Sequence, residues 1–132
     1  MVLVDTSVLI DFFRNTQNGG TEKLESLLRN GIPFGINNLI YLEMLQGAYS
    51  LKDYELLKNY LDTQIFYELK DGRTSYSSAA EIYRKCRYAG ITVSSTVDLL
   101  IVQTTIENRL FLLHNDSDYV QIKSVVPELA FY

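Results

Sequence analysis

The chain has 132 residues, of which 47% are hydrophobic, and its net charge is −4 at pH 7. This size and composition fit one compact domain with a single core, which we expect to span residues 1–132. The acidic balance excludes a protein whose whole surface grips nucleic acid.

The sequence predicts neither a membrane span nor a secretory leader. No apolar run approaches the roughly 20 residues that a membrane-spanning helix needs. The first basic residue is Arg14, so no basic segment precedes an apolar one at the N-terminus. The single cysteine, Cys86, cannot form an internal disulfide, and we expect it to contribute to the packing of a helix. We therefore expect a cytoplasmic protein.

Hydrophobic periodicity predicts short strands that alternate with helices along the chain. The expected strands are residues 2–4, 32–36, 65–69, 110–113 and 129–132. The expected helices are residues 7–14, 21–30, 38–46, 51–61, 75–89 and 95–108. The hydroxyls of Thr6 and Ser7 are expected to cap the first helix, and Gly31 is expected to end the second.

Nearly continuous apolar strands between helices predict an α/β fold, with a central parallel sheet of four to five short strands and helices on both faces. In such sheets ligands bind beyond the carboxyl ends of the strands. Asp5, in VLVDTSVLIDFF, directly follows the first strand and so lies at such an end. A helix cap and a metal ion are the two explanations for a carboxylate there.

Glu43 and Asp98 are expected on helices that pack beside the same edge of the sheet. Glu43, in NNLIYLEMLQG, falls at the border of an expected buried stripe of Leu39, Leu42 and Leu45. It is either a partly exposed glutamate beside the core or a site residue. Asp98, in SSTVDLLIV, is either the partner of a helix cap or a site residue beside a tightly packed segment.

Asp116 and Asp118 follow the fourth strand, in LLHNDSDY, where a turn or a helix cap would also use them. Four carboxylates gathered at one sheet edge would raise one another's pKa values unless a cation were present. Hard divalent ions such as Mg²⁺ take oxygen ligands and support phosphoryl transfer. The acids together therefore indicate a metal site. His114 is the only histidine, and no Ser/His/Asp set is apparent.

Residues 70–87 contain five basic and two acidic residues inside this acidic chain, with tyrosines among them. Arginines favour phosphates, and aromatic faces favour unstacked bases. The candidates for RNA binding in this segment are Arg73, Arg84, Arg87, Tyr76 and Tyr83. A solvated helix face with tyrosines packed on the core is the alternative explanation.

Four segments in collinear order resemble the PIN-domain family: VLVDTSVLIDFFR, YLEMLQG, AAEIYRKCRYAGITVSSTVDLLIV and LFLLHNDSDYVQI. The resemblance runs from Val2 to about Ile122 and is strongest to VapC-type ribonuclease toxins of bacterial and archaeal toxin–antitoxin pairs. Each segment alone is moderately specific, whereas four at this spacing are highly specific.

The resemblance implies a doubly wound α/β fold and Mg²⁺-dependent cleavage of RNA, with Mn²⁺ as a possible substitute. It carries the family's metal-binding and catalytic acids onto Asp5, Glu43, Asp98 and Asp116. Asp118 matches a further acid, and Thr6 or Ser7 matches a supporting hydroxyl beside the first acid. The resemblance also implies a homodimer and a VapB-type antitoxin whose C-terminal segment covers the site.

Two stretches depart from the family. Residues 102–105 read VQTT where relatives often have an alanine-rich stretch, and His114 and Asn115 stand where many relatives have Thr or Ser. Neither departure changes the four acids, but the second leaves open which hydroxyl supports Asp116.

Two other functions fit parts of this pattern. An aspartyl-phosphate phosphatase uses a strand-end aspartate as nucleophile, but such enzymes usually have a second Asp two residues later, where this chain has Ser7. A non-catalytic module could keep the fold and bind RNA or protein, although a binding surface has no need of clustered acids. Ile10, Phe12 and Phe13 belong either to the core or to an exposed partner-binding patch.

Overall fold

The computed structural model describes residues 1–132. The helices and strands occur in the order β1 (Val2–Val4), α1 (Thr6–Phe13), α2 (Gly19–Arg29), β2 (Phe34–Ile36), α3 (Asn38–Gln46), α4 (Leu51–Leu61), β3 (Ile65–Phe66), α5 (Arg73–Tyr88), α6 (Thr96–Glu107), β4 (Phe111–Leu113), α7 (Ser117–Lys123) and β5 (Ala130–Phe131).

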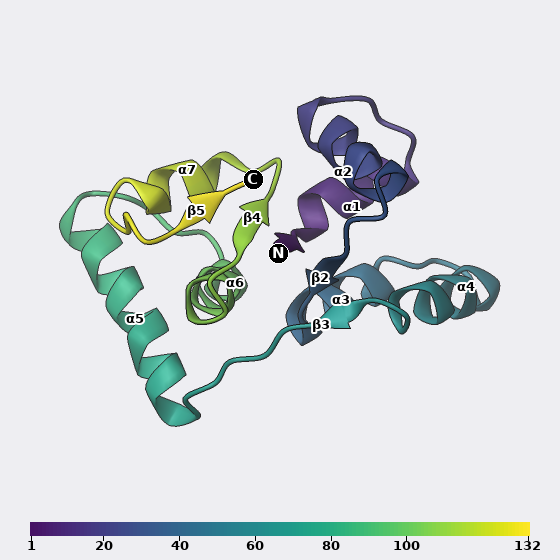
Figure 1. Ribbon diagram of the computed structural model, residues 1–132. Coiled ribbons are helices and arrows are strands. Elements are labelled where there is room, and N and C mark those ends of the chain that lie inside the picture. Colours follow the sequence, from purple (N-terminus) through teal and green to yellow (C-terminus); the bar gives the residue numbers. More distant parts are fainter.

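Five parallel strands form one sheet in the order β3-β2-β1-β4-β5. In Figure 1 this sheet lies between α1 and α2 on one side and α5 and α6 on the other. The predicted α/β fold is therefore confirmed. Because β1 pairs with both β2 and β4, the topology reverses at β1, which is where α/β sheets bind ligands.

The core consists of 26 buried hydrophobic residues around this sheet. All three residues of β1 are buried because the central strand is covered on both faces. Cys86 is also fully buried within α5, as its expected packing role requires. No helix combines the length and the apolar character that crossing a membrane requires.

The predicted boundaries agree with the structure to within two residues, except at β3. That strand was expected to cover residues 65–69 but ends at Phe66. Tyr67 still donates its backbone N–H to Ile36, and beyond it the chain turns toward α6. There the backbone N–H of Lys70 donates to the Glu107 carboxylate, and the Glu68 carbonyl accepts from Asn108. These contacts hold the chain away from the sheet edge.

One prediction about the helices was wrong, and one helix was missed. The cap of α1 is Asp5, whose carboxylate accepts the backbone N–H of Ser7, and not the hydroxyl of Thr6 or Ser7. The short helix α7 was not predicted at all, because seven residues carry too little periodicity to distinguish a helix from a turn. It begins at Asp116, its N-cap, and buries Tyr119 and Ile122.

Candidate active site

Asp5 is held at the carboxyl end of β1 by contacts from three elements. Its backbone N–H donates to Leu113 of β4 over 2.9 Å. Its Oδ2 accepts the Ser7 backbone N–H at 3.0 Å and the Ser7 hydroxyl at 2.6 Å. Its Oδ1 accepts the Tyr119 hydroxyl of α7 at 2.8 Å. The side chain is only 5% exposed, so the carboxylate is fixed in a nearly dry environment.

Asp116 and Asp118 are positioned by the loop that joins β4 to α7. Asp116 caps α7 by accepting the backbone N–H of Asp118 at 2.9 Å. The backbone N–H of Asp116 donates to Nδ1 of His114 at 3.1 Å. Asp118 accepts the hydroxyl of Ser94, just before α6, at 2.7 Å. The first turn of α7 and the segment just before α6 are thereby joined.

Asp98 completes a cluster of three carboxylates. It lies in the first turn of α6, and its side chain is partly buried. Carboxylate oxygens of Asp98, Asp116 and Asp118 all lie within 4.8 Å of one another. Asp5 lies beside this cluster, because the Tyr119 hydroxyl that donates to it is also 3.4 Å from Oδ1 of Asp98.

Burial and electrostatic repulsion both act on Asp98. Burial, followed by the charges of Asp5 and Asp116, raises the pKa of Asp98 from 3.8 to about 6. A bound cation would offset this repulsion, and carboxylate oxygens are the ligands that hard cations prefer. Asp98, Asp116 and Asp118 could therefore hold a metal ion.

Glu43, on α3, lies near Asp5 and Thr6. Burial and the Asp5 charge raise the pKa of Glu43, while the nearby Thr6 hydroxyl opposes the rise. Thr6 itself is 6% exposed, and its Oγ1 forms no hydrogen bond of good geometry, although it lies near enough to Glu43 to act on that carboxylate. A buried hydroxyl without a partner beside two carboxylates also fits a site that takes a polar ligand.

The predicted buried stripe on α3 was wrong for Leu39 and Leu42 and was confirmed for Leu45. Leu42 is 58% exposed and Leu39 is partly exposed, whereas Ile40, Met44 and Leu45 are buried. Glu43 still lies next to the buried face, because it follows Ile40 by three residues.

The structure thus brings Asp98, Asp116 and Asp118 into one cluster, with Asp5 beside it and Glu43 near Asp5. Of the two predicted hydroxyls, Ser7 contacts Asp5 and Thr6 does not. Sequence reasoning missed Tyr119, which touches two of the acids. The available signal was its position three residues after Asp116 on a helix, but that helix was not predicted.

The residues proposed to hold RNA divide into two groups. Tyr76 and Tyr83 line a cavity of about 400 Å³ that also reaches residues 94–96, next to the acids. Arg87 stacks on the Tyr83 ring, 4.9 Å from its centroid. Arg84 is instead paired with Glu81 on the exposed side of α5, and Arg73 begins that helix.

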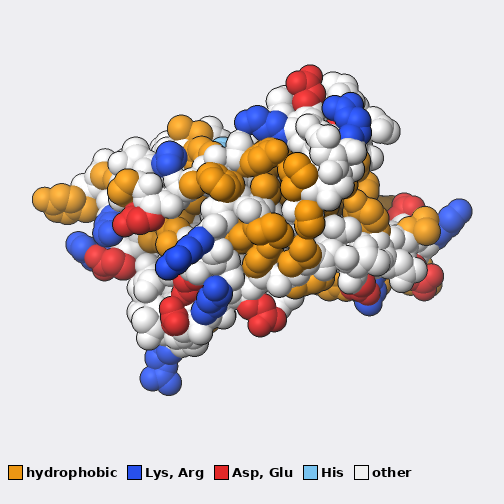
Figure 2. All heavy atoms as spheres, in the orientation of Figure 1, with side chains coloured by type: hydrophobic (Ala, Val, Ile, Leu, Met, Phe, Trp, Pro, Cys, Tyr) orange, Lys and Arg blue, Asp and Glu red, His pale blue; other side chains and the backbone are white.

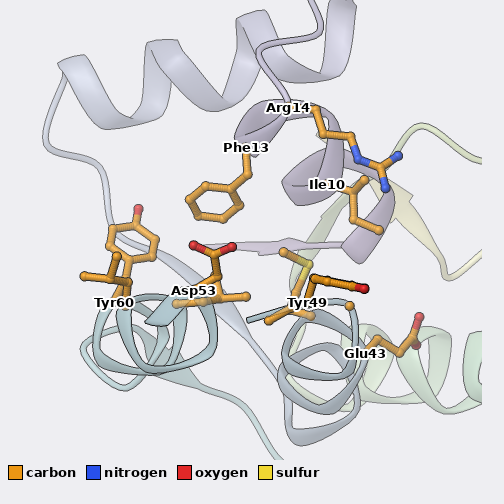
Figure 3. A pocket seen from close by; sticks show the side chains of 12 residues that line it. Ile10, Phe13, Arg14, Glu43, Tyr49, Asp53 and Tyr60 are labelled. Carbon is orange, nitrogen blue, oxygen red and sulfur yellow. The ribbon is translucent and has the colours of Figure 1, made fainter. Parts of the chain in front are cut away.

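A separate apolar groove of about 630 Å³ lies between α1, α3 and α4, and Figure 3 shows the side chains that line it. Phe13 is 43% exposed and meets the Tyr60 ring edge-on, with ring centroids 5.7 Å apart. Ile10 also lines the groove, whereas Phe12 does not. Glu43 lies at one end, so the groove runs up to the acids.

A family model described as PIN domain matches residues 2–125. The chain belongs to the PIN-domain family. The match covers all five acids, from Asp5 to Asp118, and nearly the whole length of the chain.

Relatives of this PIN-domain chain include proteins named VapC ribonuclease Mb1587, from Mycobacterium bovis, and Ribonuclease VapC11, from Mycobacterium tuberculosis. Each is 29% identical over 120 residues, which are 90% of this chain and 89% of the relative.

Solved structures share the PIN fold. One is DNA-bound VapBC from Salmonella typhimurium, with a TM-score of 0.76 and 15% identity over 99% of this chain and 96% of the other. Another is VapBC2 from Rickettsia felis bound to a promoter DNA fragment, with a TM-score of 0.74 and 16% identity over 100% and 98% of the two chains.

Proposed function

We propose that this PIN-domain chain is a Mg²⁺-dependent endoribonuclease that acts as the toxin of a toxin–antitoxin pair. The observation that carries the proposal is the convergence of Asp98, Asp116 and Asp118 beside Asp5 at the point where the sheet topology reverses. The names of two relatives, both called ribonucleases, support RNA as the substrate.

The catalytic acids in this proposal are Asp5, Glu43, Asp98 and Asp116. Together with Asp118 they would hold one or two Mg²⁺ ions, or Mn²⁺ in their place. When bound, Mg²⁺ supplies the positive charge that phosphodiester hydrolysis needs at the attacked phosphate. Water attacks phosphorus in line, and the bond to the 3′ oxygen breaks, leaving a 5′-phosphate and a 3′-hydroxyl.

The protein's own groups prepare this reaction by position. The Ser7 backbone N–H and hydroxyl fix one oxygen of Asp5. The cavity beside Tyr76 and Tyr83 would hold an unstacked base next to the acids, and Arg73 and Arg87 would bind phosphates. Arg84, held by Glu81, would contribute less.

The test compares Mg²⁺-dependent cleavage of RNA by the wild type and by Asp5→Asn and Asp98→Asn. Both variants should lose activity by at least about 100-fold while remaining folded by circular dichroism. Glu128→Gln makes the same charge change at an exposed acid away from the site and should leave activity unchanged. Wild-type activity in both folded aspartate variants would refute the metal site.

A second experiment would identify the RNA target. New RNA 5′ ends are sequenced after induced expression of the wild type and compared with those after expression of Asp98→Asn.

We further propose that the groove between α1, α3 and α4 receives a VapB-type antitoxin. Its apolar walls, the exposed Phe13 ring and Glu43 at its end suit a segment with apolar side chains and one cation directed at the acids. Phe13→Asp should weaken antitoxin binding by at least about tenfold in calorimetry, because it places a charge in the groove. Tyr88→Asp, at a 90% exposed residue on α5, is the control. Unchanged binding by Phe13→Asp would reject this groove.

The proposal includes a cytoplasmic location and a homodimer, with residues 1–132 forming a single nuclease domain. Sedimentation of the purified chain at several concentrations tests the dimer, and cell fractionation tests the location. A monomer at all concentrations would contradict the homodimer without affecting the metal-site test.

A further inference from the structure

We infer that Tyr119 is a positioning residue that orients Asp5 toward the metal. This inference rests on the proposed function of the acid cluster. Tyr119 is completely buried in α7, and its hydroxyl is 2.8 Å from Oδ1 of Asp5 and 3.4 Å from Oδ1 of Asp98. It is therefore the only side chain with hydrogen-bond contacts to both the strand-end acid and the α6 acid.

The contacts to Asp5 determine which of its oxygens remains available. Oδ2 accepts two hydrogen bonds, from the Ser7 backbone N–H and the Ser7 hydroxyl, and these use both of its lone pairs. Oδ1 accepts one, from Tyr119, and keeps one lone pair free. The Tyr119 hydroxyl thus fixes the orientation of the Asp5 carboxylate and leaves one lone pair of Oδ1 available to a cation.

The hydroxyl keeps this role at all physiological pH values. Burial and the charges of Asp5 and Asp98 raise the pKa of Tyr119 far above its usual value of 10, so the group remains a donor. A phenylalanine would fill the same place against the His114 ring, whose centroid is 5.1 Å from that of Tyr119. Packing alone therefore does not require the hydroxyl.

The experiment is calorimetric titration of the metal-free protein with Mn²⁺, comparing wild type with Tyr119→Phe. The Mn²⁺ dissociation constant should rise by about tenfold, because loss of a group that orients a ligand typically weakens metal binding by that order. Tyr41→Phe is the matched control, since Tyr41 also donates its hydroxyl to a carboxylate, that of Asp62, at 2.7 Å on the surface. It should bind Mn²⁺ as the wild type does.

A second readout separates positioning from stability. The rise in unfolding temperature on Mn²⁺ addition should shrink in Tyr119→Phe, whereas a purely structural hydroxyl would lower the metal-free unfolding temperature and leave that rise unchanged. Unchanged or tighter Mn²⁺ binding by Tyr119→Phe overturns the inference and leaves the proposed function intact. Absence of Mn²⁺ binding by the wild type overturns the proposed function itself. Tyr119→Met, which also lacks the hydroxyl, repeats the comparison if the phenylalanine variant does not fold.

Discussion

At the scale of single residues, Asp98 shows how the site opposes the stability of the fold. Its carboxylate is partly buried beside Asp5 and Asp116. Burial, and then the negative charges of these two neighbours, disfavour its ionisation. His114, a neighbour of Asp116, carries no compensating charge, because burial lowers its pKa and its Nδ1 accepts a hydrogen bond. The metal-free protein must therefore tolerate the repulsion that a cation would remove.

This repulsion should make the stability of the metal-free protein depend on pH through Asp98. Its pKa is 3.8 when the group is exposed in the unfolded chain and about 6 in the folded protein. At pH values between these two, the native state therefore binds more protons than the unfolded state. Stability from this group therefore falls as pH rises from about 4 to 6 and then stays level. Asp98→Asn should stabilise the metal-free protein by about 1–2 kcal/mol at about pH 8, after allowance for solvent screening, and hardly at all at about pH 4.

Urea unfolding in the presence of a chelator measures this difference at both pH values. Glu128→Gln, at an exposed acid, should show no such pH-dependent gain. An equal effect of Asp98→Asn at the two pH values would show that burial and repulsion do not act on Asp98 as described.

At the scale of helices and strands, the central elements could be predicted because their signals were local. The apolar run of β1 and the amphipathic pattern of α4 gave the observed boundaries, Val2–Val4 and Leu51–Leu61. The buried face of α3 could not be predicted, because its apolar residues point in more than one direction. Leu39 and Ile40 are both candidates, and only packing into the core selects Ile40.

The four aspartates of the site could be predicted because each follows a strand or lies in the first turn of a helix, and chain order fixes the place of these elements in the sheet. Asp118 and Asp116 meet Asp98 because the start of α7 is joined, through the Ser94 contact, to the segment just before α6. Tyr119 could not be predicted, because its hydroxyl reaches Asp5 across 114 residues of sequence and from a helix too short to recognise.

Strand β2 provides a prediction at this scale, because Gly35 lies under an aromatic ring. A Cβ at Gly35 would lie 2.2 Å from the Tyr67 ring and 3.1 Å from the Ile65 carbonyl. Gly35→Ala should therefore destabilise the fold by about 1–3 kcal/mol, as overpacking of a tight contact does. Gly19→Ala is the control, since a Cβ there meets nothing within 4 Å. Urea unfolding measures the free energy of unfolding of both variants and the wild type. Equal stability of Gly35→Ala and the wild type would show that the Tyr67 ring moves aside freely.

At the scale of the whole molecule, charge limits how RNA can be held. The chain carries −4 overall, and on the face in Figure 2 Lys and Arg side chains are scattered among Asp and Glu. Two of the exposed cations are already paired with carboxylates, Lys58 with Asp62 and Arg84 with Glu81. Binding through a broad basic surface is therefore excluded for this face, and contact through a few residues near the acids is favoured.

A few contacts should give a shallow dependence of RNA binding on salt. Each neutralised phosphate of a single strand contributes about −0.7 to the slope of the logarithm of the binding constant against the logarithm of the salt concentration. Contacts from Arg73 and Arg87, and at most a third contact from Arg84, therefore give a slope of about −2 or shallower. Fluorescence anisotropy with a labelled single-stranded RNA between about 50 and 200 mM KCl, at constant Mg²⁺, measures this slope. A slope near −5 would mean that many more cations than these bind the substrate.

Substitution should then locate the contacts. Arg73→Gln is expected to reduce the slope by about 0.7, because one phosphate contact is lost. Lys52→Gln removes the same charge from α4, which Figure 1 places on the opposite side of the molecule from α5. If Lys52→Gln changes the slope and Arg73→Gln does not, RNA crosses the α4 side, and the tyrosine-lined cavity beside α5 is not its path to the acids.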